Sequence, residues 1–327
     1  MTNTEDLLKK LISIPSPTGS ESEVCNFMLD LLNKEGFKTS KYEVGNERFN
    51  IVANIGNNPR VYLQAHLDTV PGIIEYSEDD ENIYGRGACD TKGSVACMVS
   101  AAISCKKQGY KNFGLIFTVG EETDFDGAKK IIQSNFPIPF VIVGEPSSLQ
   151  IVNEHFGILV IKITAKGKAA HSSKPDEGIN AIDKLLETIE KVKSLKIHPN
   201  TLMSLVLIDG GVADNVIPGL AQATFSFRVS PDDKNDYTSQ IKAFSTANIS
   251  VEETLKLNSV HTDVPKELSF IKERKTVKYS TELSFFQKGV VIGPGDIKYA
   301  HGPNEQLPKI ELKKAVEVYS QIIKNFG

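Results

Sequence analysis

The sequence predicts an α/β fold with a mainly parallel sheet, into which a second and smaller domain is inserted. In the first part of the chain, continuous apolar segments alternate with helical segments, which is typical of strands buried on both faces of a parallel sheet. After residue 146 the order becomes strand, helix, strand, strand, helix, strand, the order of a ferredoxin-like unit. We therefore expect a larger domain formed by residues 1–154 and 259–327, and an inserted domain formed by residues 155–258.

The elements of the larger domain follow from apolar runs and helical spacing. Strands are expected at residues 50–55, 61–65, 114–119, 140–143 and 289–292. Helices, in which apolar residues recur every three or four positions, are expected between Ser20 and Gly36 and at residues 94–108, 127–134 and 310–323. Ser20 and Glu23 have the spacing of a capping box, so Ser20 is expected to cap the first of these helices.

The inserted domain is expected to bury its two helices on one side of a sheet. Its strands are expected at residues 157–165, 202–208, 222–229 and 250–257, and its helices at residues 179–195 and 236–246.

Composition indicates a soluble, cytoplasmic protein. The net charge is −4 and no basic block occurs, so nucleic acid is not expected as a partner. No apolar run approaches the roughly 18 residues of a membrane-spanning helix, and the N-terminus does not have the order of a signal peptide. The four cysteines match neither a disulfide framework nor a zinc ribbon.

Side chains of the types that bind metals follow the predicted strands of the larger domain or lie in glycine-rich segments. They are His66, Asp68, Asp90, Glu121, Glu122, Glu145 and His301. Open α/β sheets bind ligands beyond the carboxyl ends of their strands, so these groups are expected to meet.

Several of these residues have an ordinary alternative when considered singly. His66 and Asp68 lie on the same face of an extended chain, but they also fit an ordinary loop pair. Asp90 fits a turn aspartate, Glu145 fits a helix-start glutamate, and His301 fits a surface histidine. A dinucleotide-binding loop around Asp90 is a weak alternative because no G-x-G-x-x-G motif is present.

The pair Glu121-Glu122 is harder to explain by structure alone. Two carboxylates about 4 Å apart repel by about 4 kcal/mol at an effective dielectric constant near 20. A division of labour explains the pair: Glu122 binds a metal and Glu121 takes a proton from the metal-bound water. A solvated loop pair is the alternative.

Charge balance favours two metal ions. The four carboxylates of Asp90, Glu121, Glu122 and Glu145 carry four negative charges, which two dications neutralise and one does not. A two-metal centre is therefore expected.

These motifs resemble those of the M20 family of dinuclear zinc amidohydrolases. The resemblance covers nearly the whole chain and rests on His66-x-Asp68, Gly85–Gly93, Glu121-Glu122 and Gly144-Glu145-Pro146 in the family order. It implies a zinc-peptidase-like catalytic domain with two Zn²⁺ ions, for which Co²⁺ or Mn²⁺ can substitute.

The resemblance also implies a role for each residue of the site. His66 and Glu145 would bind one zinc ion, Glu122 and His301 would bind the other, and Asp90 would bridge them. Glu121 would be the general base and acid, and Asp68 would orient His66.

The inserted domain resembles the lid and dimerisation domain of the family. By this resemblance His171 reaches the substrate carbonyl of a neighbouring subunit in a homodimer. Asn215 and Arg228 would bind the α-carboxylate of the substrate, a task suited to the planar guanidinium. A surface loop histidine and a lid-surface ion pair are the alternatives.

Within the family, the chain is most similar to the acetylornithine deacetylases. This likeness rests on His171-Ser172-Ser173-x-Pro175, Gly178–Ile182, Thr281-Glu282 and the segment from Gly293 to Glu305. Ser280 and Leu283 depart from the pattern of that branch.

The likeness predicts hydrolysis of an N-acyl amino acid, namely N-acetylornithine in arginine biosynthesis. The alternatives are a succinyl-diaminopimelate desuccinylase, a dipeptidase or carboxypeptidase of the same family, and a non-catalytic binding protein.

Overall fold

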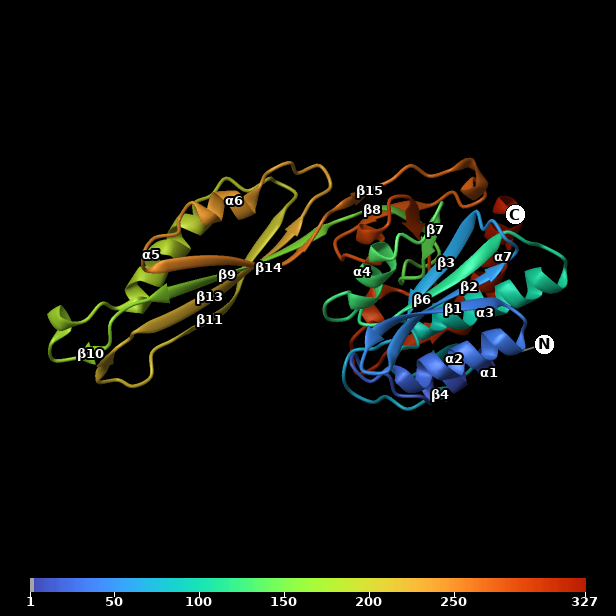
Figure 1. Ribbon diagram of the computed structural model, residues 1–327, viewed down its shortest axis with the longest axis horizontal. Coiled ribbons are helices and arrows are strands. Elements are labelled where there is room, and N and C mark those ends of the chain that lie inside the picture. Colours follow the sequence, from blue (N-terminus) through green and yellow to red (C-terminus); the bar gives the residue numbers. More distant parts are fainter. Residues whose placement is uncertain (1–2) are drawn as a thin grey trace. The chain divides into compact units, whose positions relative to one another are not determined.

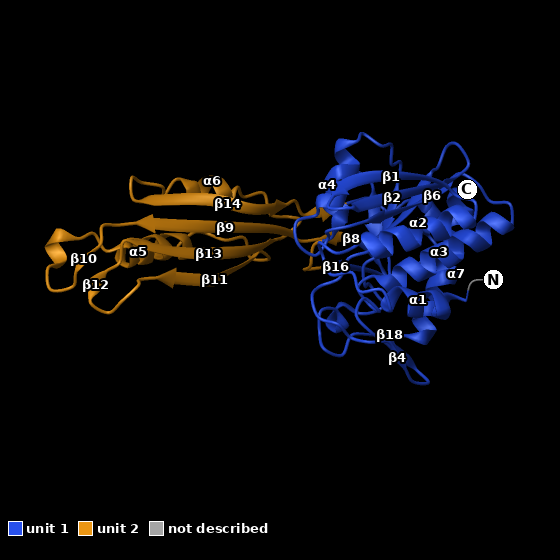
Figure 2. Cartoon of the chain, turned by 60° about the horizontal axis from the view of Figure 1, so that its bottom comes forward, with its two compact units in different colours: residues 1–153, 262–276, 281–327 blue, residues 154–261, 277–280 orange. Residues whose placement is uncertain are grey.

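The computed structural model describes residues 3–327, which form two compact units (Figure 1, Figure 2). Unit 1 comprises residues 1–153, 262–276 and 281–327, and unit 2 comprises residues 154–261 and 277–280. Residues 154, 259–261 and 277–280, which the sequence predicted in the larger domain, belong to unit 2.

Unit 1 is built on a mixed sheet with parallel strands at its centre. The parallel strands are neighbours in the order β6 (Phe113–Thr118), β3 (Val61–His66), β7 (Val141–Val143) and β17 (Gly289–Val291). Antiparallel strands extend both sides: β2 (Arg48–Ile55) and β1 (Lys38–Gly45) beside β6, and β8 (Ile151–His155) beside β17. This architecture confirms the predicted α/β fold class.

The helices of unit 1 are amphipathic or wholly buried, according to their position. They are α1 (Thr4–Ile12), α2 (Ser22–Lys34), α3 (Lys92–Lys107), α4 (Asp126–Gln133) and α7 (Lys309–Phe326). Helix α3 packs against α1, α7 and β3. It is buried on nearly all sides, which its small Ala, Ser, Cys and Val side chains permit.

The predicted cap of α2 is wrong. The residue that precedes the helix is Glu21, and no side chain caps it. Glu21 is buried and its carboxylate pairs with Arg48 at 3.3 Å. The helix begins at Ser22, one residue later than the predicted capping box would place it.

Several elements were not predicted. Among them are α1, β1, β8 and a small sheet of β4 (Ser77–Glu78), β5 (Asn82–Tyr84) and β18 (Gln306–Pro308). Of these strands, β1 is a polar edge strand, and the others have five residues or fewer, so none of them shows a long apolar run.

Unit 2 contains the predicted order of strands and helices. Its elements are β9 (Gly157–Lys166), α5 (Ala181–Lys193), β11 (Leu202–Gly210), β13 (Leu220–Val229), α6 (Tyr237–Lys242) and β14 (Ile249–Leu257). The sheet order is β11-β13-β9-β14. Alternate residues of β9 and β13 are buried beneath the helices, so unit 2 has its own hydrophobic core.

Within residues 3–327 no helix combines the length and apolar character needed to cross a membrane.

Candidate metal centre

Three parallel strands of unit 1 end at one edge of the sheet and deliver the predicted site residues there. His66 is the last residue of β3, and it is aligned with Thr118, the last residue of β6. Gln64 of β3 is aligned with Val143, the last residue of β7. The turn with Glu121 and Glu122 and the turn with Glu145 therefore both begin beside His66, as parallel strands require.

Asp90 lies between the two histidines and presents one carboxylate oxygen to each. Its Oδ1 is 3.1 Å from Nε2 of His66, and its Oδ2 is 3.1 Å from Nε2 of His301. Asp90 is buried in the segment between β5 and α3. A carboxylate that faces two imidazoles in this way is able to bridge two cations.

Each histidine also has a carboxylate of its own. Glu145 Oε1 is 3.7 Å from Nε2 of His66, and Glu122 Oε2 is 2.9 Å from Nε2 of His301. His66, Asp90 and Glu122 offer ligand atoms within 4.8 Å of one another. This set of nitrogen and oxygen donors fits a centre for two divalent metal ions, with Asp90 common to both halves.

The electrostatics of the site favour a cation. Burial and the neighbouring carboxylate of Asp90 raise the pKa of Glu145 well above its ordinary value. Burial is also the main cause that raises the pKa of Glu122. Burial lowers the pKa of His66, but hydrogen bonds with Asp68 and Asp90 outweigh it and raise that pKa. Without a metal, protons must neutralise this cluster, because buried like charges repel strongly.

Glu121 directly precedes Glu122 in the turn after β6. Burial, aided by the neighbouring Glu122, raises the pKa of Glu121 well above its ordinary value. A carboxyl group with a raised pKa next to a metal centre has the properties of a general base that later returns its proton.

Asp68 contacts His66 differently from the way the sequence predicted. Nδ1 of His66 is 2.9 Å from the backbone carbonyl oxygen of Asp68 and 3.5 Å from its carboxylate. The closer contact is therefore made by the backbone. The carboxylate accepts hydrogen bonds from Thr18 and from the backbone amides of Glu121 and Glu122.

The structure adds a buried carboxyl group, that of Glu282, to which the sequence assigned no role in the site. Glu282 lies in a short 3₁₀ helix, η3 (Glu282–Phe285), and hydrogen bonds from Gln64 and Thr118 reach its Oε2. Burial raises the pKa of Glu282 to about 7. Glu282 thus contacts residues near the ends of β3 and β6. The sequence around Glu282 gave no indication that its carboxyl group is buried there.

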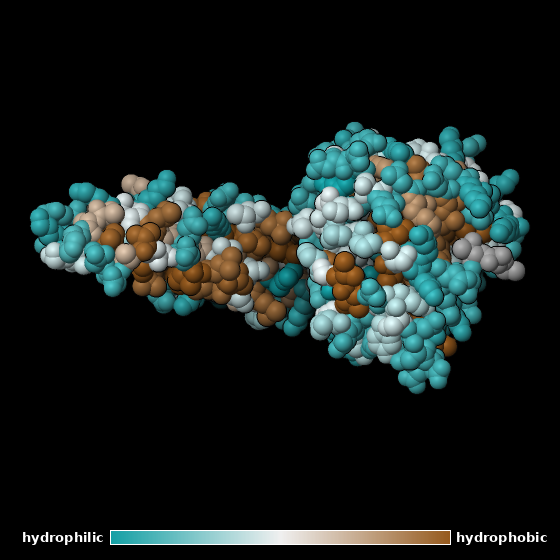
Figure 3. Space-filling model, turned by 90° about the horizontal axis from the view of Figure 1, so that it is seen from below, coloured by the Kyte–Doolittle hydropathy of each residue, from teal (hydrophilic) through white to brown (hydrophobic). Residues whose placement is uncertain are grey.

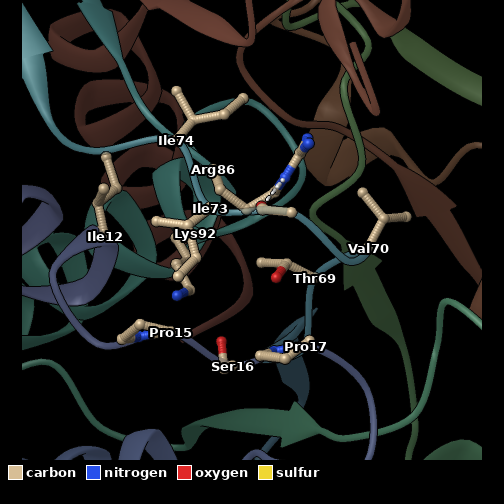
Figure 4. A pocket seen from close by; sticks show the side chains of 11 residues that line it. Ile12, Pro15, Ser16, Pro17, Thr69, Val70, Ile73, Ile74, Arg86 and Lys92 are labelled. Atoms are coloured by element: carbon tan, nitrogen blue, oxygen red, sulfur yellow. Dashed lines mark hydrogen bonds between the residues drawn. The ribbon is translucent and has the colours of Figure 1, made fainter. Parts of the chain in front are cut away.

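A pocket lies next to the segments that carry Asp68 and Asp90, but it is not lined by the predicted ligands (Figure 4). Its walls are mostly apolar, and they include Ile12, Val70 and Ile73. Lys92 also lines it and donates hydrogen bonds to the carbonyl oxygens of Leu11 and Ile14. Burial lowers the pKa of Lys92 to about 8. These bonds tie the end of α1 to the start of α3.

The three remaining predicted residues belong to unit 2. His171 is exposed, its Nδ1 is 2.8 Å from Oγ of Ser173, and it pairs with Val216 beside Asn215. Arg228 is half-buried near the end of β13. His171 and Asn215 lie beside Val216, which shortly precedes β13 in the chain, whereas Arg228 lies near the other end of this strand. Residues 221–228 of β13 span roughly 24 Å at ~3.4 Å per residue. His171 and Asn215 therefore lie far from Arg228 within unit 2.

Comparisons with known proteins find relatives among the peptidases, and this agrees with a site that could hold metal ions. Peptidase family M20/M25/M40 matches residues 62–325. A probable carboxypeptidase of Aspergillus clavatus is 32% identical over 360 residues, which cover 96% of this chain and 86% of the relative.

Solved structures share the fold. A tripeptidase of Staphylococcus aureus has a TM-score of 0.86 at 22% identity and covers 99% of this chain and 97% of its own. An M20 family metallo-carboxypeptidase of Sulfolobus solfataricus has a TM-score of 0.80 at 17% identity, with coverages of 100% and 99%.

The names of these relatives are those of peptidases, and they give no support to an acetylornithine deacetylase. The family match extends over all the residues of the candidate metal centre, from His66 to His301. The chain therefore belongs to peptidase family M20/M25/M40.

Proposed function

We propose that the protein is a two-zinc hydrolase that cleaves the amide bond next to an amino acid with a free α-carboxylate. The observation that carries the proposal is the position of Asp90, whose two oxygens each face a histidine. Each histidine has a second carboxylate nearby, Glu145 for His66 and Glu122 for His301. These five residues would hold the two ions.

The proposed mechanism gives the proton transfers to Glu121. Two bound zinc ions would acidify a water molecule and polarise the substrate carbonyl. Glu121 would accept the proton of the attacking water and return it to the leaving amine. The raised pKa of Glu121 supports this role, because the group must be able to hold a proton near neutral pH. The presence of this base argues against a non-catalytic binding protein.

The preferred substrate class is a small peptide cleaved at its carboxyl end. The probable carboxypeptidases among the relatives support this choice. Arg228 and Asn215 would bind the α-carboxylate, and His171 would donate to the developing oxyanion.

Deacetylation of N-acetylornithine is the second candidate, with succinyl-diaminopimelate as a related substrate. Its support is the motif from His171 to Pro175 in unit 2. Both candidates leave a free amino acid and use the same residues.

A homodimer formed through unit 2 is part of the proposal. Strand β11 is an edge of its sheet, and Val206, Leu207 and Ile208 of this strand are at least half exposed. Figure 3 shows apolar surface along unit 2. An exposed apolar edge strand is a ready template for pairing with another chain.

The distance between His171 and Arg228 also supports a dimer. Because they lie near opposite ends of unit 2, one copy does not bring both to a single small substrate. Two copies would. A cytoplasmic location is also part of the proposal, because all four cysteines are free and buried, as a reducing compartment would keep them.

A hydrolysis panel tests the proposed function. The zinc-loaded protein is given dipeptides and tripeptides, N-acetylornithine, N-succinyl-diaminopimelate and N-acetylmethionine. We expect the peptides to give the highest kcat/KM. A clear preference for N-acetylornithine would replace the peptidase proposal, and no hydrolysis of any substrate would overturn both candidates.

A further inference from the structure

A carboxylate outside the metal centre holds the segment that carries Asp90. Glu305 is buried, with a side-chain exposure of 1%. Its Oε1 accepts hydrogen bonds from the backbone amides of Cys89 and Asp90 at 3.1 and 3.0 Å. Its Oε2 accepts one from Nη1 of Arg86 at 2.8 Å. Glu305 thus bonds to three donors within five residues of the chain.

Arg86 is itself fixed on its other side. Its Nε donates to the carbonyl oxygen of Gly72 at 3.0 Å, and its backbone amide donates to the carbonyl oxygen of Ile74. These bonds restrict the movement of the Arg86 guanidinium. Its ion pair therefore holds the Glu305 carboxylate next to the backbone amide of Asp90. Charge-assisted bonds of this kind are about twice as strong as neutral ones.

Glu305 also lies only four residues after His301. The strand that follows it, β18, pairs with β5, the strand that leads into Arg86 and Asp90. The segment of His301 and the segment of Asp90 are thereby joined side by side. Their side chains meet at 3.1 Å, between Nε2 of His301 and Oδ2 of Asp90.

His301 needs such support because its own surroundings are open. Its side chain is 52% exposed, and its backbone has a φ of 62°, in the left-handed region that non-glycine residues adopt at a cost. Little packing therefore fixes His301 from the solvent side.

We propose that Glu305 is a positioning residue of the metal centre. It holds the carboxylate of Asp90 against His301 and so sets the affinity of the metal position that these residues share with Glu122. The inference rests on the proposed function, because it assumes that these residues bind zinc. Partners of ligands in other metal sites change affinity by about 10- to 100-fold when they are removed.

The substitution Glu305→Gln tests the proposal. The carboxamide oxygen is able to accept from the two amides, but its NH₂ group would face the Arg86 guanidinium without an acceptor. Asp79→Asn is the matched control, because Asp79 also accepts two backbone amides, of Glu81 and Asn82, and a side-chain donor, the hydroxyl of Tyr84. Asp79 is exposed, and its partners do not include Arg86, Cys89 or Asp90.

The readouts are zinc affinity, by competition with a chelating dye, and the visible absorption of the cobalt-loaded protein. We expect Glu305→Gln to weaken zinc binding by about 10- to 100-fold, most of all at the position that includes His301, and to change the cobalt spectrum. Excess zinc is expected to restore hydrolysis. Asp79→Asn is expected to leave both affinities and the spectrum as in the wild type.

A second variant separates positioning from simple loss of charge and covers the case in which Glu305→Gln does not fold. Arg86→Met removes a positive charge near the centre, so electrostatics alone would tighten zinc binding, whereas loss of positioning would weaken it. Weaker binding supports the proposal. Unchanged or tighter binding in Arg86→Met, or wild-type affinities in folded Glu305→Gln, overturns it.

The test of Glu305 and the test of the proposed function can fail independently of each other. If the wild type binds two zinc ions but hydrolyses nothing, the proposed function fails and the affinity comparison still decides the role of Glu305.

Discussion

The carboxylate of Asp68 accepts a hydrogen bond from the backbone amide of Glu121 at 3.1 Å. Its second oxygen accepts from the amide of Glu122, also at 3.1 Å, and from the hydroxyl of Thr18 at 2.8 Å. Asp68 therefore fixes the turn that carries the proposed base and a proposed ligand. The backbone carbonyl of Asp68 holds the imidazole of His66, so one residue positions two parts of the site with two different groups.

Asp68→Asn is expected to lower kcat by about 10- to 100-fold. A carboxamide has one acceptor oxygen, and its NH₂ group would face an amide donor of the Glu121 turn. Thr18→Val, which removes one bond and keeps the carboxylate, is the control and is expected to have a smaller effect. Steady-state kinetics with zinc-loaded protein measure both. A kcat of Asp68→Asn equal to that of the wild type would contradict this role.

Glu121→Gln is expected to lower kcat by several orders of magnitude while metal content stays at two ions per chain. The carboxamide cannot accept the proton of the attacking water. Kinetics and elemental analysis of the same sample check the two halves of this expectation. Asp124→Asn, an exposed carboxylate in the same turn, is the control. Near-wild-type turnover of Glu121→Gln would remove Glu121 from the mechanism.

Metal removal is expected to destabilise unit 1 more at about pH 7.5 than at about pH 5.5. Burial, together with neighbouring carboxylates, raises the pKa of Glu121 and of Glu145 in the metal-free protein. A carboxyl group whose folded pKa is raised binds more protons when folded, so its contribution to stability falls as pH rises through that pKa.

Thermal unfolding with zinc and with a chelator, at both pH values, measures the difference. Glu145→Gln removes one of these groups and is expected to reduce the pH dependence of the metal-free protein. An equal loss of Tm on chelation at both pH values would show that these carboxyl groups do not control metal-free stability.

His155 is expected to destabilise the protein in acid. It is buried in β8, and burial lowers its pKa to about 4. The unfolded chain therefore binds more protons between about pH 6.5 and about pH 4, and stability falls as pH decreases through this window, by about 3 kcal/mol for this group.

Denaturant unfolding of the wild type and of His155→Gln at several pH values isolates this contribution. The difference between their unfolding free energies is expected to change across the window. His198→Gln, in which a more exposed histidine is replaced, is the control and is expected to follow the wild type. A constant difference for His155→Gln would refute the assignment.

Leu207→Lys is expected to dissociate the proposed dimer. Leu207 is 66% exposed on the edge strand β11, and a lysine on an edge strand prevents pairing with another chain. Light scattering after gel filtration measures the mass, and kcat/KM is expected to fall about 100-fold because the oxyanion donor His171 would be lost. Ile310→Lys, at a similarly exposed apolar residue of unit 1, is the control. A monomeric wild type with full activity would exclude the dimer.

The sequence predicted the parts of the site that lie at the ends of buried strands. His66, Glu122 and Glu145 follow apolar runs whose continuity indicates burial on both faces, and parallel topology then brings the strand ends together. Burial in the core is a property that hydrophobic patterning records well.

The locations of polar side chains that pair with residues far away in the sequence were not predictable in the same way. Glu21, the residue that precedes α2, is buried in an ion pair with Arg48, which lies in a strand of the sheet. Glu305 and Glu282 are buried by tertiary contacts with residues more than 150 positions away. Local sequence patterns do not indicate which distant residues will be the partners of a polar side chain.

The two proposed metal positions differ in their access to solvent. His66 is wholly enclosed in the sheet edge, whereas half of the surface of His301 is open. An ion beside His301 would exchange with the medium long before an ion beside His66. The protein would then pass through a form that holds an ion only beside His66, the enclosed histidine, before it loses both ions.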